Sequence, residues 1–274
     1  MKMKQTLLGL ALTAALVLPA SAARGLSAPA AQALSVNGKD LWSGARARVV
    51  DDVTYVSLRT VSEELAPQAR VEWKDGEARV RGKGVDLTAR PGDQWLTVND
   101  RALYIPGGVL AEDGAVLVPV RALAQALGGQ VDWSREAGVS LTPGSGAPDP
   151  APYTEDELYW MARIISAESR GEPLLGKLAV GTVVLNRVAD EEFPDSIYDV
   201  IFDRKWGVQF TPVANGTIYL EPTEESVLAA KLVLDGARAA GDSLYFLAPD
   251  LTDNHWIMEN QSYVTTIGCH WFYR

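Results

Sequence analysis

A glutamate at the end of an apolar helical stripe is the residue of this chain best suited to proton transfer. Leu158, Met161 and Ile165 recur at spacings of three and four, and Glu168 follows Ile165 by three. If the helix lasts that far, the Glu168 carboxyl lies on the core-facing side. Burial and the negative end of the helix dipole both favour its neutral form. A carboxyl protonated near neutral pH can donate a proton to a leaving oxygen, so the pattern predicts a general acid.

The segment around Glu168 also carries signals for both helix ends. The tetrapeptide T-E-D-E at 154–157 is a capping box, which predicts a helix start there. The tripeptide G-E-P at 171–173 predicts that the helix stops just beyond Glu168. Spacing alone leaves a plainer interpretation open, in which Glu168 is a surface residue paired with Arg170 or Lys177.

Further elements are expected downstream of this helix. Apolar periodicity and capping residues predict helices over 174–188, 196–202 and 223–235, and strands within 244–246 and 263–273. Asn186 and Arg187 are expected to close the first of these helices as scaffold residues. The region is therefore predicted to be mostly helical with a small β-sheet.

The region before residue 145 repeats itself. The tripeptide V-N-G at 36–38 recurs as V-N-D at 98–100, 62 residues later. Each copy predicts strands on both sides of a short helix, at 58–65 and 120–127. The sequence therefore predicts a duplicated small α+β domain over 34–142.

The chain divides into four parts. They are a signal peptide at 1–22, the duplicated α+β domain at 34–142, a Pro/Gly-rich linker at 143–152 and the mostly helical domain at 153–274. The first part has a basic start, a short apolar run and a small-x-small cleavage pattern. Its apolar run is shorter than the roughly 20 residues that a spanning helix needs. Export without a membrane anchor after cleavage is the prediction.

Bulk composition excludes some classes of partner. The formal net charge of -10 argues against binding to nucleic acid or to an anionic membrane surface, and leaves a glycan possible. Cys269 is the single cysteine of the chain, so no intramolecular disulfide can form. The sequence leaves the oligomeric state open.

Six blocks in order give the second domain a family resemblance. They are "AESRGEP", "AVGTVVLNRV", "FPDSIYDVIF", "QFTPV", "LYFLAP" and "TTIGCHWFY". Together they resemble the cell-wall hydrolase family of the spore-cortex-lytic enzymes (SleB/CwlJ type), over residues 153–274. The resemblance implies a lysozyme-like fold of the kind seen in lytic transglycosylases and a peptidoglycan glycan strand as substrate. It also implies one catalytic glutamate in the first block, which is Glu168.

A single carboxylate suffices for a lytic transglycosylase, because Glu168 can act first as acid and then as base. We expect cleavage between N-acetylmuramic acid and N-acetylglucosamine, with a spore-cortex role in germination as one setting. Gln209 is expected to hydrogen-bond a sugar substituent and Phe210 to form a wall. Tyr245 and Tyr263 are expected to line the groove through their hydroxyls.

Other enzyme classes stay open at this point. A hydrolytic muramidase needs a second carboxylate, and the chain offers Glu172, Asp199, Asp203 and Glu221. A cysteine amidase would need Cys269 activated by a histidine, but adjacent residues in a strand, such as Cys269 and His270, point to opposite faces. A zinc amidase would have to use His255 and His270 without a recognised spacing. A non-catalytic wall-binding protein is the last alternative.

The duplicated domain also resembles a known family, the copper amine oxidase N-terminal domain found as an accessory module. No histidine precedes His255, so a histidine-type copper site is excluded in this domain. We expect neither a cofactor nor a metal for the chain.

Overall fold

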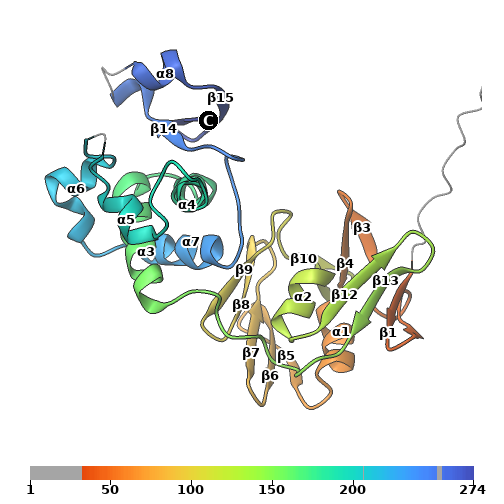
Figure 1. The fold of residues 1–274 in the computed structure, drawn as a ribbon. Helices are drawn as coiled ribbons and strands as arrows, with labels where there is room; N and C mark the ends of the chain where they lie inside the picture. Colours follow the sequence, from red (N-terminus) through yellow and green to blue (C-terminus); the bar gives the residue numbers. More distant parts are fainter. Residues whose placement is uncertain (1–32, 206, 252–254) are drawn as a thin grey trace, which may run out of the picture.

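The computed structural model describes residues 33–205, 207–251 and 255–274 and shows two domains side by side (Figure 1). A sheet-rich domain comes first, and helix α3 leads from the linker into a mostly helical second domain. The predicted signal peptide, 1–22, lies outside the described residues. Within the described ranges, no helix has the length and apolarity needed to cross a bilayer.

The first domain is built from thirteen short strands and two helices. Its elements are β1 (Leu34–Val36), β2 (Lys39–Asp40), β3 (Arg48–Val50), β4 (Val53–Ser57), α1 (Leu58–Leu65), β5 (Arg70–Lys74), β6 (Glu77–Gly82), β7 (Val85–Ala89), β8 (Trp95–Val98), β9 (Arg101–Tyr104), β10 (Leu110–Glu112), β11 (Ala115–Pro119), α2 (Val120–Ala126), β12 (Gln130–Ser134) and β13 (Gly138–Thr142). The strands form sheets of order β12-β13-β1-β2, β10-β11-β4-β3 and β5-β6-β7-β8-β9.

The two expected short helices follow strands that pair with each other. Strand β4 runs antiparallel to β11, with Val56 opposite Val118. Helix α1 follows β4 directly and α2 follows β11, at the positions predicted from the sequence. Apolar residues of both halves share one buried cluster, which includes Leu58 and Leu123. The helices are confirmed, and the duplication itself stays an inference from the repeated sequence.

The second domain contains six helices, two 3-10 turns and one small sheet within the described residues. Its elements are α3 (Glu155–Ser169), α4 (Leu174–Val188), α5 (Ile197–Phe202), α6 (Thr211–Asn215), η1 (Thr217–Tyr219), α7 (Glu224–Leu234), β14 (Tyr245–Leu247), η2 (Pro249–Leu251), α8 (Trp256–Asn260), β15 (Tyr263–Ile267) and β16 (His270–Tyr273). The sheet has the order β14-β16-β15. The three predicted helices correspond to α4, α5 and α7.

Helix α3 begins at the predicted capping box. The backbone N–H of Glu157 donates to the Thr154 hydroxyl at 3.2 Å, and the backbone N–H of Thr154 donates to the Glu157 carboxylate at 2.7 Å. These bonds satisfy two N–H groups at the start of the helix that have no intrahelical partner. The register of the whole helix, and so the direction of Glu168, is fixed from this end.

Helices α3, α4 and α7 pack closely around Gly181. A Cβ at position 181 would lie 2.9 Å from Ile165 Cδ1 and 3.1 Å from Val233 Cγ2, so a larger side chain would push the helices apart. Ile165 is fully buried at this contact, as the apolar stripe of α3 predicts. The packing holds Ile165, near the C-terminal end of α3, against the middle of α4.

The two domains are joined by a buried ion pair. Asp235, directly after α7, accepts hydrogen bonds from Nε and Nη2 of Arg101 in β9, the first at 2.8 Å. The side chain of Asp235 is fully buried and that of Arg101 is 8% exposed. Burial, followed by the charge of Asp235, raises the pKa of the neighbouring Tyr153 phenol to about 12. Charged groups this deeply buried depend on their pairing to offset the cost of desolvation.

The linker is held to the first domain along its length. Arg101 Nη1 donates to the Asp149 carbonyl at 2.9 Å. A Cβ on Gly144 would lie 1.7 Å from the Gly128 carbonyl oxygen, so only glycine fits there. The composition of 143–152 indicates an extended spacer, and the structure adds that this spacer is docked.

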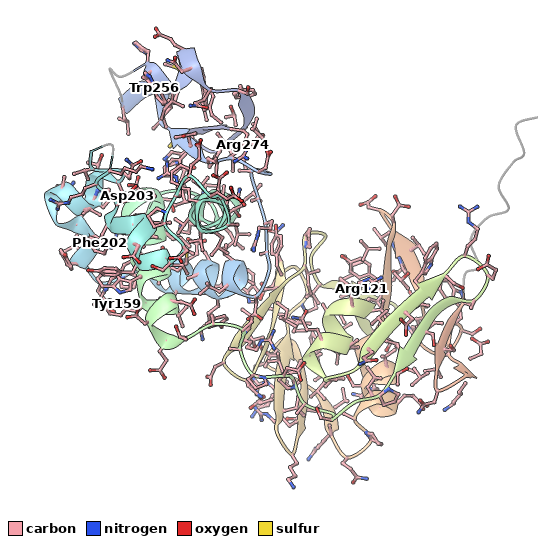
Figure 2. All side chains as sticks on the ribbon, in the orientation of Figure 1. Arg121, Tyr159, Phe202, Asp203, Trp256 and Arg274 are labelled. Atoms are coloured by element: carbon pink, nitrogen blue, oxygen red, sulfur yellow. The ribbon has the colours of Figure 1, made fainter. Side chains whose placement is uncertain are left out.

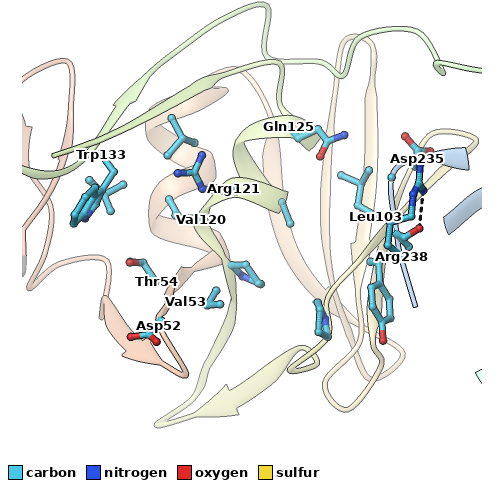
Figure 3. A pocket seen from close by; sticks show the side chains of 18 residues that line it. Asp52, Val53, Thr54, Leu103, Val120, Arg121, Gln125, Trp133, Asp235 and Arg238 are labelled. Atoms are coloured by element: carbon cyan, nitrogen blue, oxygen red, sulfur yellow. Dashed lines mark hydrogen bonds between the residues drawn. The ribbon is translucent and has the colours of Figure 1, made fainter. Parts of the chain in front are cut away.

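A cavity of about 660 Å³ lies beside this junction. Figure 3 shows Trp133 at one end of it, Arg121 in the middle, and Asp235 and Arg238 at the other end. Both domains contribute to its lining, because Arg238 follows α7 while Arg121 belongs to α2. Glu168 is not among its lining residues.

Removing Asp235 should destabilise the protein much more than removing a surface aspartate of the same domain. Asp235→Ala leaves the Arg101 guanidinium buried without its partner, so we expect the free energy of unfolding to fall by about 3–5 kcal/mol. Urea denaturation followed by tryptophan fluorescence measures it.

Asp242→Ala is the matched control, because Asp242 is 76% exposed and its contact with Arg274 is 3.7 Å long. We expect a change below about 1 kcal/mol for this variant. Equal losses for the two variants would show that the buried pair does not hold the domains together.

Candidate active site

Glu168 lies in the last turn of α3 with a half-buried side chain. Burial raises the pKa of its carboxyl to about 7, and the Arg187 guanidinium opposes this rise without cancelling it. No described residue forms a hydrogen bond with the carboxyl. Near neutral pH, Glu168 is therefore divided between its acid and base forms, so it could donate or accept a proton there.

The neighbours that could have neutralised Glu168 have other partners. Arg170 Nη2 donates to the Glu221 carbonyl at 3.0 Å. Lys177 is almost fully buried, pairs with Glu225 at 2.9 Å and donates to the carbonyl of Glu172. The interpretation of Glu168 as a surface residue paired with Arg170 or Lys177 is wrong.

Arg187 is a buried cation close enough to the carboxyl to act on its charge. It is 4% exposed, and its Nε donates to the Leu244 carbonyl at 2.7 Å. The guanidinium carbon lies 4.9, 5.1 and 5.5 Å from the ring centroids of Phe193, Phe210 and Tyr245. Burial lowers the pKa of Arg187 to about 10, so the group keeps its charge at neutral pH. Its Nη1 has no hydrogen-bond partner among the described residues.

A groove of about 930 Å³ opens over Glu168 and Arg187. Asp203, next to α5, and Trp256, in α8, both line it and are labelled in Figure 2. Its lining residues are Glu168, Arg187, Glu192, Phe193, Asp203, Val208, Gln209, Phe210, Thr211, Tyr245, Phe246, Leu247, Ala248, Leu251, Trp256, Ile257 and His270. A lining of apolar and aromatic side chains with a few polar groups is typical of small-molecule sites.

A second cavity of about 380 Å³ lies on the other side of Glu168. Its lining includes Arg163, Asn215 and Thr217, and it shares Glu168 and Thr211 with the first groove. The carboxyl thus stands where two cavities meet. A chain-like ligand that occupies both would place its middle at Glu168.

Three of the four predicted substrate contacts line the groove. Gln209 lies at its wall, with Nε2 donating to the Gly207 carbonyl at 3.3 Å. Phe210 also lines it but is only 2% exposed, because its ring belongs to the helical core. Tyr245, at the start of β14, is half-buried and packs edge-on against Phe193 and Trp256.

Tyr263 does not line the groove, and the expectation that it would is wrong. It lies in β15, the edge strand on the far side of β16, and is 58% exposed. Its hydroxyl shares a hydrogen bond of 2.9 Å with Thr266. Strand order separates it from Tyr245, and the sequence gives no signal for that order.

The four residues that could supply a second carboxylate lie in different places, and only one of them lines the groove. Asp203 lines the groove, and its carboxylate accepts the Lys205 backbone N–H at 2.8 Å. Asp199 bonds the Ser196 hydroxyl in the first turn of α5, and Glu221 is a surface partner of Arg163. Glu172 binds the Cys269 backbone N–H at 3.1 Å. Glu192, which was not considered from the sequence, also lines the groove.

Arg187 lies in the last turn of α4, as expected for a residue that closes the helix, and the structure also places it in the lining of the groove, which the sequence did not predict. A signal was present, because an arginine follows seven largely apolar residues of a buried helix and so had to find a polar environment.

Family comparisons match each domain separately. The model described as "Cell Wall Hydrolase" matches residues 171–273, and the model described as "Copper amine oxidase N-terminal domain" matches residues 32–141. The first match begins just after Glu168.

Relatives match the second domain. A spore cortex-lytic enzyme from Bacillus cereus is 38% identical over 123 residues, which cover 45% of this chain and 46% of the relative. The chain thus spans less than half of that relative's length. A cell wall hydrolase CwlJ from Oceanobacillus iheyensis is 30% identical over 104 residues, covering 36% of this chain and 72% of that protein.

A solved structure matches the same region. It is the catalytic domain of the germination-specific lytic transglycosylase SleB from Bacillus anthracis, 37% identical to this chain. The match covers 46% of this chain and 100% of that domain, with a TM-score of 0.42.

Replacing Glu168 with glutamine should stabilise the fold at neutral and alkaline pH. The ordinary pKa of 4.5 rises to about 7 in the folded chain, so between these values the folded chain holds a proton that the unfolded chain has lost. Raising the pH through this window therefore costs stability, by at most about 3 kcal/mol. The neutral amide of Glu168→Gln removes that cost.

Urea denaturation of both proteins from pH 4 to pH 8 tests this. The difference in the free energy of unfolding should be small near pH 4.5, grow in favour of the variant and level off above pH 7. A difference that does not change with pH would mean that Glu168 titrates normally.

Proposed function

The chain belongs to the cell wall hydrolase family, and from that premise we propose that it cleaves peptidoglycan glycan strands between N-acetylmuramic acid and N-acetylglucosamine. The observation that carries this proposal is the Glu168 carboxyl, with a pKa of about 7, at the junction of two cavities. We include a lysozyme-like arrangement of the helices in the proposal. Export and action on wall or spore-cortex peptidoglycan are also part of it, in keeping with the names of the relatives.

The first step is proton donation by Glu168. The glycan strand lies across both cavities, with the scissile bond at the carboxyl. Glu168 protonates the glycosidic oxygen, the bond from that oxygen to C1 of the muramic residue breaks, and the N-acetylglucosamine side leaves with a free hydroxyl. The N-acetyl group of the substrate stabilises the oxocarbenium-like C1, so the enzyme needs no carboxylate nucleophile.

The second step returns the proton. Glu168, now a carboxylate, takes the proton from the C6 hydroxyl of the muramic residue while that oxygen bonds to C1. A 1,6-anhydro ring forms, and the carboxyl is again neutral for the next cycle. Arg187 supports both steps, because its charge keeps the pKa of Glu168 from rising further and stabilises the carboxylate between them.

The groove residues have separate roles in this proposal. Gln209 hydrogen-bonds a sugar substituent, and Phe210, which is 2% exposed, forms part of the groove wall. Tyr245 offers its hydroxyl to the strand from the β14 side. The uncharged sugar rings of the strand stack on aromatic side chains of the groove.

Hydrolysis by a muramidase is the second candidate, favoured by one observation. Asp203 and Glu192 line the same groove as Glu168, so a carboxylate is available to activate water. A cysteine amidase has less support, because hydrogen bonding to Glu172 raises the pKa of Cys269 and disfavours a thiolate nucleophile. A purely wall-binding protein would have no need of a tuned carboxyl.

Glu168→Gln should abolish clearing of peptidoglycan in zymography. General acid–base catalysis contributes about 10²–10⁴-fold, so we expect a loss of at least that size. The kcat/KM of the wild type should fall as the pH rises above about 7, where Glu168 loses its proton. Mass spectrometry should find 1,6-anhydromuramic ends in the products.

Glu221→Gln is the control, since Glu221 is a surface partner of Arg163, and it should clear normally. Clearing by Glu168→Gln would remove this residue from the mechanism. Products with reducing ends would show that the enzyme is a muramidase and not a transglycosylase. Released stem peptides would show that it is an amidase.

Two tyrosine variants test whether the glycan strand binds beside Tyr245 and not beside Tyr263. Tyr245→Phe removes a hydroxyl from the groove lining, so we expect KM to rise by several fold with little change in kcat. Tyr263→Phe removes a hydroxyl that binds only Thr266 among the described residues, so its kinetics should match the wild type. Soluble glycan fragments of defined length are the substrate, and equal effects of the two variants would contradict this placement of the strand.

A further inference from the structure

Three potential metal ligands converge beside the groove, outside the proposed reaction. They are a carboxylate oxygen of Glu172, Sγ of Cys269 and a ring nitrogen of His270, and all lie within 4.8 Å of one another. Cys269 Sγ is 2.9 Å from Glu172 Oε1 and 3.9 Å from His270 Nδ1. We propose that these three side chains form a binding site for a zinc-class divalent cation.

The site joins two distant parts of the chain. Glu172 precedes α4, whereas Cys269 and His270 form the turn and first residue of the β15–β16 hairpin. The expectation that Cys269 and His270 point to opposite faces fails because Cys269 is not within a strand. Gly268, with φ of 59°, turns the chain there and brings both side chains to the same side.

The carboxylate is held in place before any cation binds. Its Oε2 accepts the Cys269 backbone N–H at 3.1 Å. A Cβ on Gly268 would lie 1.6 Å from Oε2, and a Cβ on Gly176 would lie 2.9 Å from Glu172 Cβ. Only glycine at these two positions lets the carboxylate approach the hairpin so closely, so its orientation is largely preset.

The imidazole is also oriented by its surroundings. His270 is 6% exposed, and its ring packs edge-on against Phe246 at 5.3 Å and Phe272 at 6.3 Å. Cys269, in contrast, is exposed and gives a path from solvent. The site therefore has a fixed inner side and an open outer side.

The donor set points to zinc rather than to calcium or magnesium. Thiolate and imidazole are ligands of borderline metals, while calcium and magnesium prefer oxygen alone. Tetrahedral zinc sites use Zn–S near 2.3 Å and Zn–N or Zn–O near 2.1 Å, which place the donor atoms roughly 3.3–3.8 Å apart. The Sγ–Oε1 distance of 2.9 Å lies just below this range and the Sγ–Nδ1 distance of 3.9 Å just above it. Binding exchanges the thiol proton for the cation, the proton leaves to solvent, and a fourth position stays open for water.

A hydrogen-bonded clamp without a cation is the competing interpretation. Glu172 already accepts from the Cys269 N–H and thiol, and these bonds alone could tie the hairpin to α4. The two differ in what they require. A clamp needs a hydrogen-bond acceptor at 172, which glutamine also supplies, whereas a cation site needs the carboxylate charge and the thiolate.

Cobalt(II) titration of the metal-free protein tests the site, because thiolate-to-cobalt charge transfer gives a near-ultraviolet absorption band. The wild type should show this band with one cobalt per chain, and zinc should displace it. Cys269→Ser should lose the band. Glu172→Gln should bind cobalt more weakly, by more than the roughly 10–100-fold cost of changing a residue that only orients a ligand. Zinc should raise the Tm of the wild type and leave that of Cys269→Ser unchanged.

Controls separate this site from other binding. His255→Ala removes the other histidine of the chain and should keep the band and its affinity. Circular dichroism of each variant checks that the fold is intact. Absence of the band in the wild type, its survival in Cys269→Ser, or two chains per cobalt in size-exclusion chromatography would overturn the proposal. None of these readouts depends on glycan cleavage, so the site and the proposed function stand or fall separately.

Discussion

The protonation state of the half-buried Glu168 carboxyl depends on the buried Arg187 guanidinium near it, and the second domain is built around this pair. Burial favours the neutral form of Glu168, and the charge of Arg187 favours the ionised form. Desolvation is the larger effect, and the balance leaves the carboxyl near pKa 7. A direct ion pair would hold Glu168 ionised, and removal of Arg187 would hold it neutral. The proposed transfer of a proton in both directions requires the intermediate arrangement.

This arrangement costs stability, and the rest of the domain compensates. Arg187 Nη1 is buried with no hydrogen-bond partner in the described part of the chain, which carries a desolvation cost. Three aromatic rings around its guanidinium recover part of it through cation–π contact. The rest of this desolvation cost is offset by the tight α3–α4–α7 packing at Gly181 and by the capping box of α3. These two features lie away from the groove, whereas the three aromatic rings both line the groove and stabilise the buried guanidinium.

Local signals carried most of what the sequence could predict. The capping box, the 3.6-residue apolar period and the glycine–proline stop depend on neighbours within a few positions, and they placed α3, α4 and Glu168 correctly. Features that depend on distant pairing were missed. Tyr263 was misplaced because strand order decides which face a hairpin presents. The meeting of Cys269, His270 and Glu172 depends on a turn at Gly268 that strand alternation ignores.

The position of the first domain bears on whether it could block the groove. Its strand β9 is fixed to the end of α7 by the Arg101–Asp235 pair, and the docked linker adds a second attachment. Both cavities at Glu168 are lined by residues from 163 onward, and no described residue of the first domain takes part in either. Figure 1 shows α7 between that domain and the elements α8 and β14. An inhibitory plug would have to break a buried ion pair and move around α7. The structure instead fits a first domain that is fixed at the end of α7 and leaves both cavities at Glu168 open.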